Sequence, residues 1–166
     1  MAGRFSAAVP QPSFLVDEML GRLARYLRFV GCDAEYVRDV DDAEILTRAR
    51  SEGRIILTRD RILARSAPHA LLLTQLGIAE QWREVRRAFP ALNTRVQFDR
   101  CTECNGVLSE WHPPASEAQT PGVPWDRVAQ GLLLYRCERC AHLYWEGSHT
   151  AHIARRLAEW EGREAA

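Results

Sequence analysis

The chain has 166 residues, of which 46% are hydrophobic and 27% charged, a composition typical of a soluble globular protein. Its 22 basic and 22 acidic residues balance, so no global electric field argues for a nucleic-acid partner. Because no apolar run reaches the roughly 20 residues that cross a bilayer, and no secretory signal pattern is present, we expect a cytoplasmic protein without a membrane partner.

The pattern of residues divides the chain into three parts. Residues 1–13 contain two prolines and no periodicity, so we expect a flexible leader. Residues 14–94 alternate short apolar runs with amphipathic segments, which is typical of an α/β domain. Residues 95–166 carry four of the five cysteines. We therefore expect an α/β domain followed by a small cysteine-rich module with a terminal helix.

In the first domain, strands are expected to alternate with helices. Continuous apolar runs without alternation predict strands that are buried on both faces of a sheet. Their order argues for a parallel sheet with right-handed crossovers and helices on both faces. The predicted strand and helix pairs are residues 14–16 and 17–30, 34–40 and 41–53, 55–58 and 61–66, and 71–74 and 78–89.

Carboxylates follow the first three predicted strands. Asp17 and Asp60 end the first and third, and Asp42 follows the second. Each one alone could be a helix N-cap, a role that Asp41 takes with Glu44 in a predicted capping box. Parallel strands share one carboxyl edge, so the three aspartates are expected to converge there. A divalent cation would let them all stay ionised, and oxygen ligands suit magnesium or manganese, which assist phosphodiester hydrolysis.

Two Cys-x-x-Cys pairs, separated by residues 105–136, dominate the second module. Short strands are expected before and after each pair. Four thiolates with this spacing indicate a tetrahedral structural zinc site, although a pair of redox motifs is an alternative. A ribbon this small cannot bury enough apolar surface to fold alone, so the metal is expected to supply folding free energy. The predicted zinc ligands are Cys101, Cys104, Cys137 and Cys140.

The chain contains arginine but no lysine. Two groups of arginines are candidates for binding a polyanionic substrate. Arg22, Arg25 and Arg28 recur at a three-residue interval on the first predicted helix. They form either a solvated face or a track for a phosphate backbone. Within residues 82–100, five arginines stand against two acidic residues, a local excess that a polyanion would need.

Four separated segments resemble the Mut-seven C-terminal ribonuclease domain family. They are FLVDEMLGRLARYLR (14–28), ILTRD (56–60), RCTECNG (100–106) and YWEGSH (144–149), and the resemblance covers about residues 14–160. It implies a PIN-like Rossmannoid fold with a zinc ribbon behind it and metal-dependent ribonuclease activity. It also implies that the catalytic acids fall on Asp17, Asp42 and Asp60.

We therefore predict a magnesium- or manganese-dependent endoribonuclease, with a PIN-like domain over residues 14–94 and a zinc ribbon over 95–166. The alternative is a non-catalytic RNA- or protein-binding module with a vestigial acidic crevice, and no sequence feature identifies a protein partner. In the leading hypothesis the aspartates hold the ion and arginines contact the RNA backbone. The residues assigned are Asp17, Asp42 and Asp60, Glu18 or Glu44 as a candidate fourth acid, and Arg22, Arg25, Arg59 and Arg100 for RNA.

Overall fold

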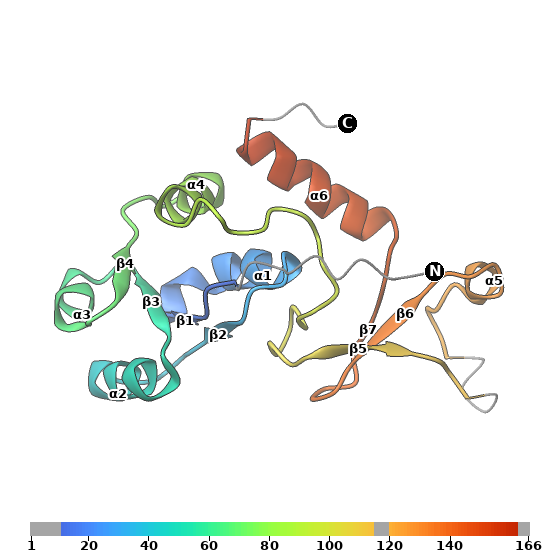
Figure 1. Ribbon diagram of the computed structural model, residues 1–166, viewed down its shortest axis with the longest axis horizontal. Coiled ribbons are helices and arrows are strands. Elements are labelled where there is room, and N and C mark those ends of the chain that lie inside the picture. The colour runs from blue at the N-terminus through green and yellow to red at the C-terminus, as the bar shows by residue number, and fades with distance from the viewer. Residues whose placement is uncertain (1–10, 115–119, 163–166) are drawn as a thin grey trace.

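The computed structural model describes residues 11–114 and 120–162, so most of the predicted leader lies outside the described residues. The first half of the chain forms a four-stranded parallel sheet with strand order β2-β1-β3-β4 (Figure 1). A 3-10 turn at Glu18–Leu20 precedes the first helix. The strands are β1 Phe14–Val16, β2 Ala34–Tyr36, β3 Ile55–Thr58 and β4 Ala70–Leu72, and the helices are α1 Gly21–Phe29, α2 Asp42–Glu52, α3 Arg61–Ser66 and α4 Ile78–Ala88.

Helices cover both faces of this sheet, as the sequence predicts. Successive side chains of a strand point to opposite faces, and in β1 Phe14 packs into a core with α1 and α4 while Leu15 packs into a core with α2 and α3. Both side chains are fully buried. β1, β3 and β4 each contribute to both cores, which explains their continuous apolar runs, whereas β2 contributes to the first core alone.

Gly31 makes the turn from α1 into β2. Its φ is +86°, and a Cβ atom there would lie 2.7 Å from the Asp99 carboxylate. Only glycine adopts this conformation without strain and leaves room for that neighbour. The turn brings the chain back to start β2 parallel to β1.

The second half forms a three-stranded antiparallel sheet with strand order β5-β6-β7. Strands precede and follow the second cysteine pair as predicted, and β5 follows the first, but the strand predicted before the first pair is reduced to an isolated bridge between Arg100 and Val107. There the chain docks on the first domain instead of pairing along its length. The elements are β5 Leu108–Trp111, the one-turn helix α5 Trp125–Val128, β6 Leu134–Cys137, β7 Leu143–Trp145 and α6 Ser148–Trp160.

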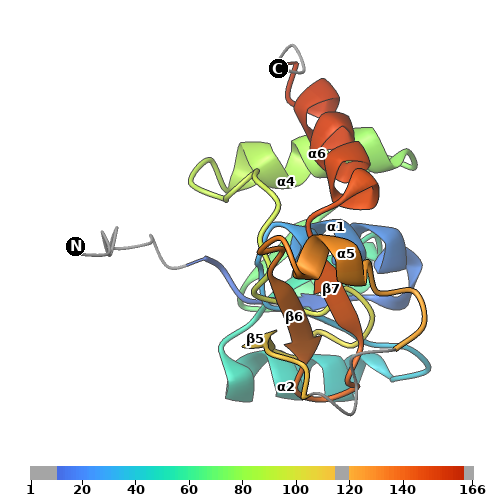
Figure 2. The same ribbon diagram turned by 90° about the vertical axis from the view of Figure 1, so that its right-hand side faces the viewer.

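The terminal helix α6 returns to the parallel sheet. It leaves β7 and lies over α1 beside α4 (Figures 1 and 2). Its buried residues join the same core as Phe14, and the ring of Trp160 lies 4.6 Å from that of Tyr26 and 6.3 Å from that of Trp82. The last helix of the proposed 95–166 module thus packs against the proposed 14–94 domain. None of the described helices has the length and apolar character that a membrane span requires.

Replacing Trp160 tests this packing. We expect Trp160→Ala to lower the free energy of unfolding by about 3–5 kcal/mol, because truncating a buried aromatic loses its transfer energy and leaves a cavity. Urea unfolding measures the change. The control is His152→Ala on the exposed side of the same helix, which should alter stability by less than about 0.5 kcal/mol. Equal stability of both variants would show that α6 does not contribute to the core.

Candidate functional site

A buried hydroxyl links two aspartates at the carboxyl edge of the sheet. Asp17, which follows β1, is only 8% exposed. Its Oδ1 accepts a hydrogen bond from the Glu18 amide (2.7 Å), and its Oδ2 accepts one from the Thr58 hydroxyl (2.6 Å). The Thr58 oxygen in turn accepts from the amide of Asp60 (2.9 Å). The ends of the neighbouring strands β1 and β3 are therefore joined by one chain of hydrogen bonds.

Thr58 was not among the predicted site residues. It is fully buried at the end of an otherwise apolar strand, where a hydroxyl needs a partner. A threonine at a strand end, two residues before an acid, is the sequence signal that could have identified it. Its bond to the Asp17 carboxylate is charge-assisted and short, so it holds that side chain in one orientation.

Asp60 is at once the N-cap of α3 and a candidate ligand. Its Oδ1 accepts from the amides of the second and third residues of that helix, Ile62 (2.6 Å) and Leu63 (3.0 Å). Its Oδ2 has no hydrogen bond to any described residue. An ionised carboxylate offers about four lone-pair sites, so capping leaves capacity for a further ligand.

Asp42 is exposed at the first position of α2, and the cap of that helix is Asp41, whose Oδ1 accepts from the Glu44 amide (2.8 Å). The side chain of Asp42 has no hydrogen bond to a described residue. The two candidate fourth acids are also exposed, and the Oε2 atom of Glu18 accepts from the Asp39 amide (3.3 Å). The capping role predicted for Asp41 is thus confirmed, and Asp42 stays unengaged.

Because β1, β2 and β3 are parallel, all three aspartates lie at or just beyond the same edge of the sheet. They are more widely spaced than the cysteines: among the described residues, only the four cysteines place three or more ligand atoms within 4.8 Å of one another. Magnesium usually keeps several waters and few direct carboxylates. An ion at this edge would therefore bind with water between it and some of the aspartates.

The predicted RNA-binding arginines have different surroundings. Arg22 and Arg25 are exposed on α1, and Arg25 pairs with Glu103 at 2.6 Å. Arg100 lies 3.6 Å from Asp33. Arg59, between Thr58 and Asp60, has a buried Nε atom without a hydrogen-bond partner among the described residues. Of the four predicted RNA-binding arginines, Arg22 and Arg59 thus form no ion pair with a described acid.

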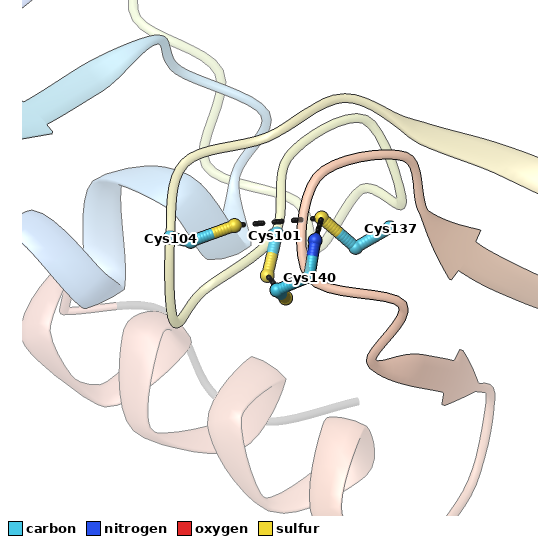
Figure 3. A group of neighbouring side chains, drawn as sticks. All are labelled: Cys101, Cys104, Cys137 and Cys140. Atoms are coloured by element: carbon cyan, nitrogen blue, oxygen red, sulfur yellow. Dashed lines mark hydrogen bonds between the residues drawn. The ribbon is translucent and has the colours of Figure 1, made fainter.

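The four cysteine sulfurs gather between two loops, the first knuckle (residues 101–106) and the second knuckle (residues 137–142) (Figure 3). Across the knuckles, the Sγ atoms of Cys101 and Cys140 lie 3.6 Å apart and those of Cys104 and Cys137 lie 3.4 Å apart. Both distances exceed the roughly 2.05 Å of a disulfide. A tetrahedral zinc ion with Zn–S bonds of about 2.3 Å needs sulfurs about 3.8 Å apart, so the cluster fits structural zinc.

The cysteines of this cluster differ in how readily they ionise. Burial raises the pKa of Cys137, but hydrogen bonds from the amides of Cys140 and Arg139 and from the neighbouring thiols outweigh it and lower the pKa to about 7. Burial raises the pKa of Cys104 to about 12. The thiolate is the species that binds metal. The surroundings therefore favour the thiolate at Cys137, and the case for a metal site rests on the closeness of the four sulfurs.

A buried arginine docks the first knuckle on the parallel sheet. The sequence pattern places Arg28 on an exposed stripe with Arg25, but its side chain is buried, and burial lowers its pKa. Its Nε donates to the carbonyl of Ala34 (2.8 Å), and its Nη1 donates to those of Thr102 (3.0 Å) and Glu103 (3.2 Å). Arg28 is thus neither a solvated residue nor available to a phosphate backbone.

Asn105 completes the docking from the first knuckle. Its Oδ1 accepts from the amide of Ala34 (3.0 Å), and its Nδ2 donates to Asp33 (2.7 Å). Burial raises the pKa of Asp33, but hydrogen bonds from Arg54 and Asn105 outweigh it and hold that pKa below its ordinary value. The edge strand β2 therefore depends on the knuckle for some of its hydrogen bonds.

Loss of one zinc ligand should unfold the ribbon. We expect Cys137→Ser to lose bound zinc and to melt at a lower temperature, because the ribbon's own core is small. Zinc per chain by atomic absorption and thermal unfolding measure both effects. Cys32→Ala is the control, because Cys32 is buried in the first domain's core away from the cluster and should leave the zinc content unchanged. Equal zinc content in parent and Cys137→Ser would rule out the site.

Comparison with known proteins agrees with this arrangement. The family model described as the Mut7-C RNAse domain matches residues 12–157. No curated protein and no solved structure gives a match. The matched residues include both the acidic edge and the four-cysteine cluster. The chain therefore belongs to the Mut7-C RNAse domain family.

Proposed function

We propose that this chain is a magnesium- or manganese-dependent endoribonuclease whose ion is held by Asp17, Asp42 and Asp60. The observation that carries this proposal is the hydrogen-bonded path from Asp17 through Thr58 to Asp60 at the ends of adjacent parallel strands. A ribonuclease domain supplies the reaction class. The acidic edge supplies the chemistry that phosphodiester hydrolysis needs.

Each proposed ligand keeps an oxygen for the ion. Asp60 uses only Oδ1 in capping α3, and Asp42 has no hydrogen bond to a described residue because Asp41 caps α2 in its place. Asp17 uses both oxygens, but each one accepts a single bond and retains a lone pair. Capping and metal binding are compatible here, because the cap fixes one oxygen and orients the other.

An ion at this edge would stabilise charge on the phosphate and activate the attacking water. The residues of the chain hold and orient the reacting groups. Thr58 fixes Asp17, and the amides of α3 fix Asp60. Arg22 and Arg59, which pair with no described acid, would bind phosphates near the edge, and Glu18 or Glu44 is the candidate fourth acid. We propose that RNA crosses this edge with its backbone against these arginines.

Carboxylate-to-amide substitutions test the catalytic assignment. We expect Asp17→Asn and Asp60→Asn each to lower manganese-dependent cleavage of single-stranded RNA by about a hundredfold or more, because the ion is worth several kcal/mol of charge stabilisation. Thermal stability should stay nearly unchanged in Asp60→Asn, because both capping bonds go to one oxygen, which asparagine keeps. Asp17→Asn keeps one of two acceptor oxygens, so circular dichroism must show that this variant is folded.

Asp41→Asn is the matched control for this experiment. Asp41 carries the same charge, caps the neighbouring helix and is not a proposed ligand. Its cleavage rate should equal that of the parent. If Asp17→Asn and Asp60→Asn also cut at the parental rate, the catalytic assignment is wrong and a non-catalytic RNA- or protein-binding module takes its place.

A further inference from the structure

A cavity of about 220 Å³ lies where the ribbon meets the parallel-sheet domain. Aromatic rings from α1, from the segment before the first knuckle and from β7 form much of its wall. Pockets that hold drug-sized ligands measure roughly 300–1,000 Å³, so this one suits a smaller planar group such as a single nucleobase. The aromatic residues are Phe29, Phe98, Tyr144 and Trp145.

A second hollow of about 190 Å³ continues this cavity between α1 and α6. It shares Arg25, Phe29 and His149 with the first and extends to Arg22. We name the two together the α1 groove. Because α1 starts at the carboxyl end of β1 and returns along the sheet, Arg22 marks the end of the groove nearer to Asp17. Seven residues of helix, about 10 Å, separate Arg22 from Phe29.

Trp145 is the ring in this groove that is free to take a ligand. It is half-buried, and its indole makes no hydrogen bond or ring contact with a described residue. Tyr144, in contrast, is held by a hydrogen bond from the Thr102 amide to its hydroxyl oxygen (3.2 Å). One face of Phe98 is already stacked on Tyr135, with ring centroids 4.6 Å apart. A base would therefore stack on Trp145.

The cations of the groove are available to phosphates. Arg22 has no acidic partner among the described residues, and Arg25 pairs with Glu103 while both side chains stay about half exposed, at 53% and 50%. An ion pair this exposed contributes little, typically 0–1 kcal/mol. A phosphate could replace Glu103 as the partner of Arg25 at small cost.

We propose that the α1 groove binds single-stranded RNA, with one unpaired base against Trp145 and backbone phosphates on Arg22 and Arg25. The inference rests on the proposed function only in taking RNA as the substrate. The base held here is not the reacting nucleotide, because the aromatic cavity lies at the end of α1 away from the acidic edge. Stacking on an aromatic ring accepts any base, so the groove would bind strands without sequence preference.

The experiment measures binding separately from cleavage, by fluorescence anisotropy of a labelled oligoadenylate on the Asp17→Asn background. Trp145→Leu, which keeps an apolar side chain but no ring, should weaken binding about tenfold, and Trp145→Phe should restore most of it. Arg25→Gln should weaken binding and make the slope of log affinity against log salt shallower by about 0.7. Arg50→Gln is the matched control: Arg50 lies exposed on α2, over the opposite face of the sheet.

Two further measurements separate RNA binding from a structural role. Inorganic polyphosphate has phosphates but no base, so Trp145→Leu should leave its affinity unchanged while Arg25→Gln lowers it. Glu103→Gln should strengthen oligoadenylate binding because it frees Arg25. If the Arg25–Glu103 ion pair served only to hold the two modules together, Arg25→Gln and Glu103→Gln would each weaken oligoadenylate binding.

Oligoadenylate affinities equal to that of the parent in Trp145→Leu and Arg25→Gln would overturn the groove and leave the catalytic assignment standing. Weaker binding in Glu103→Gln, or a loss of affinity in Trp145→Leu that Trp145→Phe does not restore, would also overturn it. Conversely, active cleavage by Asp17→Asn together with the expected binding losses would overturn the catalytic proposal and keep the groove.

Discussion

The buried guanidinium of Arg28 holds the two halves of the molecule together. A charge taken out of water is costly unless it is fully hydrogen-bonded, and three backbone carbonyls meet this need, one from β2 and two from the first knuckle. Removing the side chain would leave those carbonyls buried without a partner. The orientation of the ribbon on the sheet, and with it the α1 groove, follows from this contact.

The ribbon has little else to fix its shape. Its own core consists of two cysteines and Leu108, with a few half-buried rings packed against them. Four sulfurs within 4.8 Å of one another and two buried polar side chains at the domain contact therefore take the place of the apolar core that a larger module would have. Tyr144 connects the two requirements, because its hydroxyl contacts both Cys101 and Thr102. The four-cysteine cluster and the aromatic wall of the groove are thus in direct contact through one side chain.

At the acidic edge, helix capping and the proposed chemistry use the same side chains. Asp60 lies two residues after β3 and is the N-cap of α3, so its position is fixed by local structure before any ligand binds. Thr58 accepts a hydrogen bond from the Asp60 amide and donates one to Asp17, so the Asp17 side chain is oriented as well. An ion binds with a smaller loss of conformational entropy when the scaffold already orients the side chains that would hold it. Asp42 is the exception, because its exposed side chain is held by no described neighbour.

The sequence by itself determined the local elements: apolar runs and capping residues place β3 and α3 at the predicted residues, and two Cys-x-x-Cys pairs identify the metal cluster. These features depend on neighbours within a few positions, so a pattern can show them. Only the tertiary structure decided that Arg28 is buried, that Thr58 joins two aspartates, and that α6 packs over the sheet. Periodicity indicates the apolar face of a helix, but it does not say which distant segment covers a polar residue such as Arg28. The partners of these residues lie up to about 130 positions away, and only the folded chain brings them into contact.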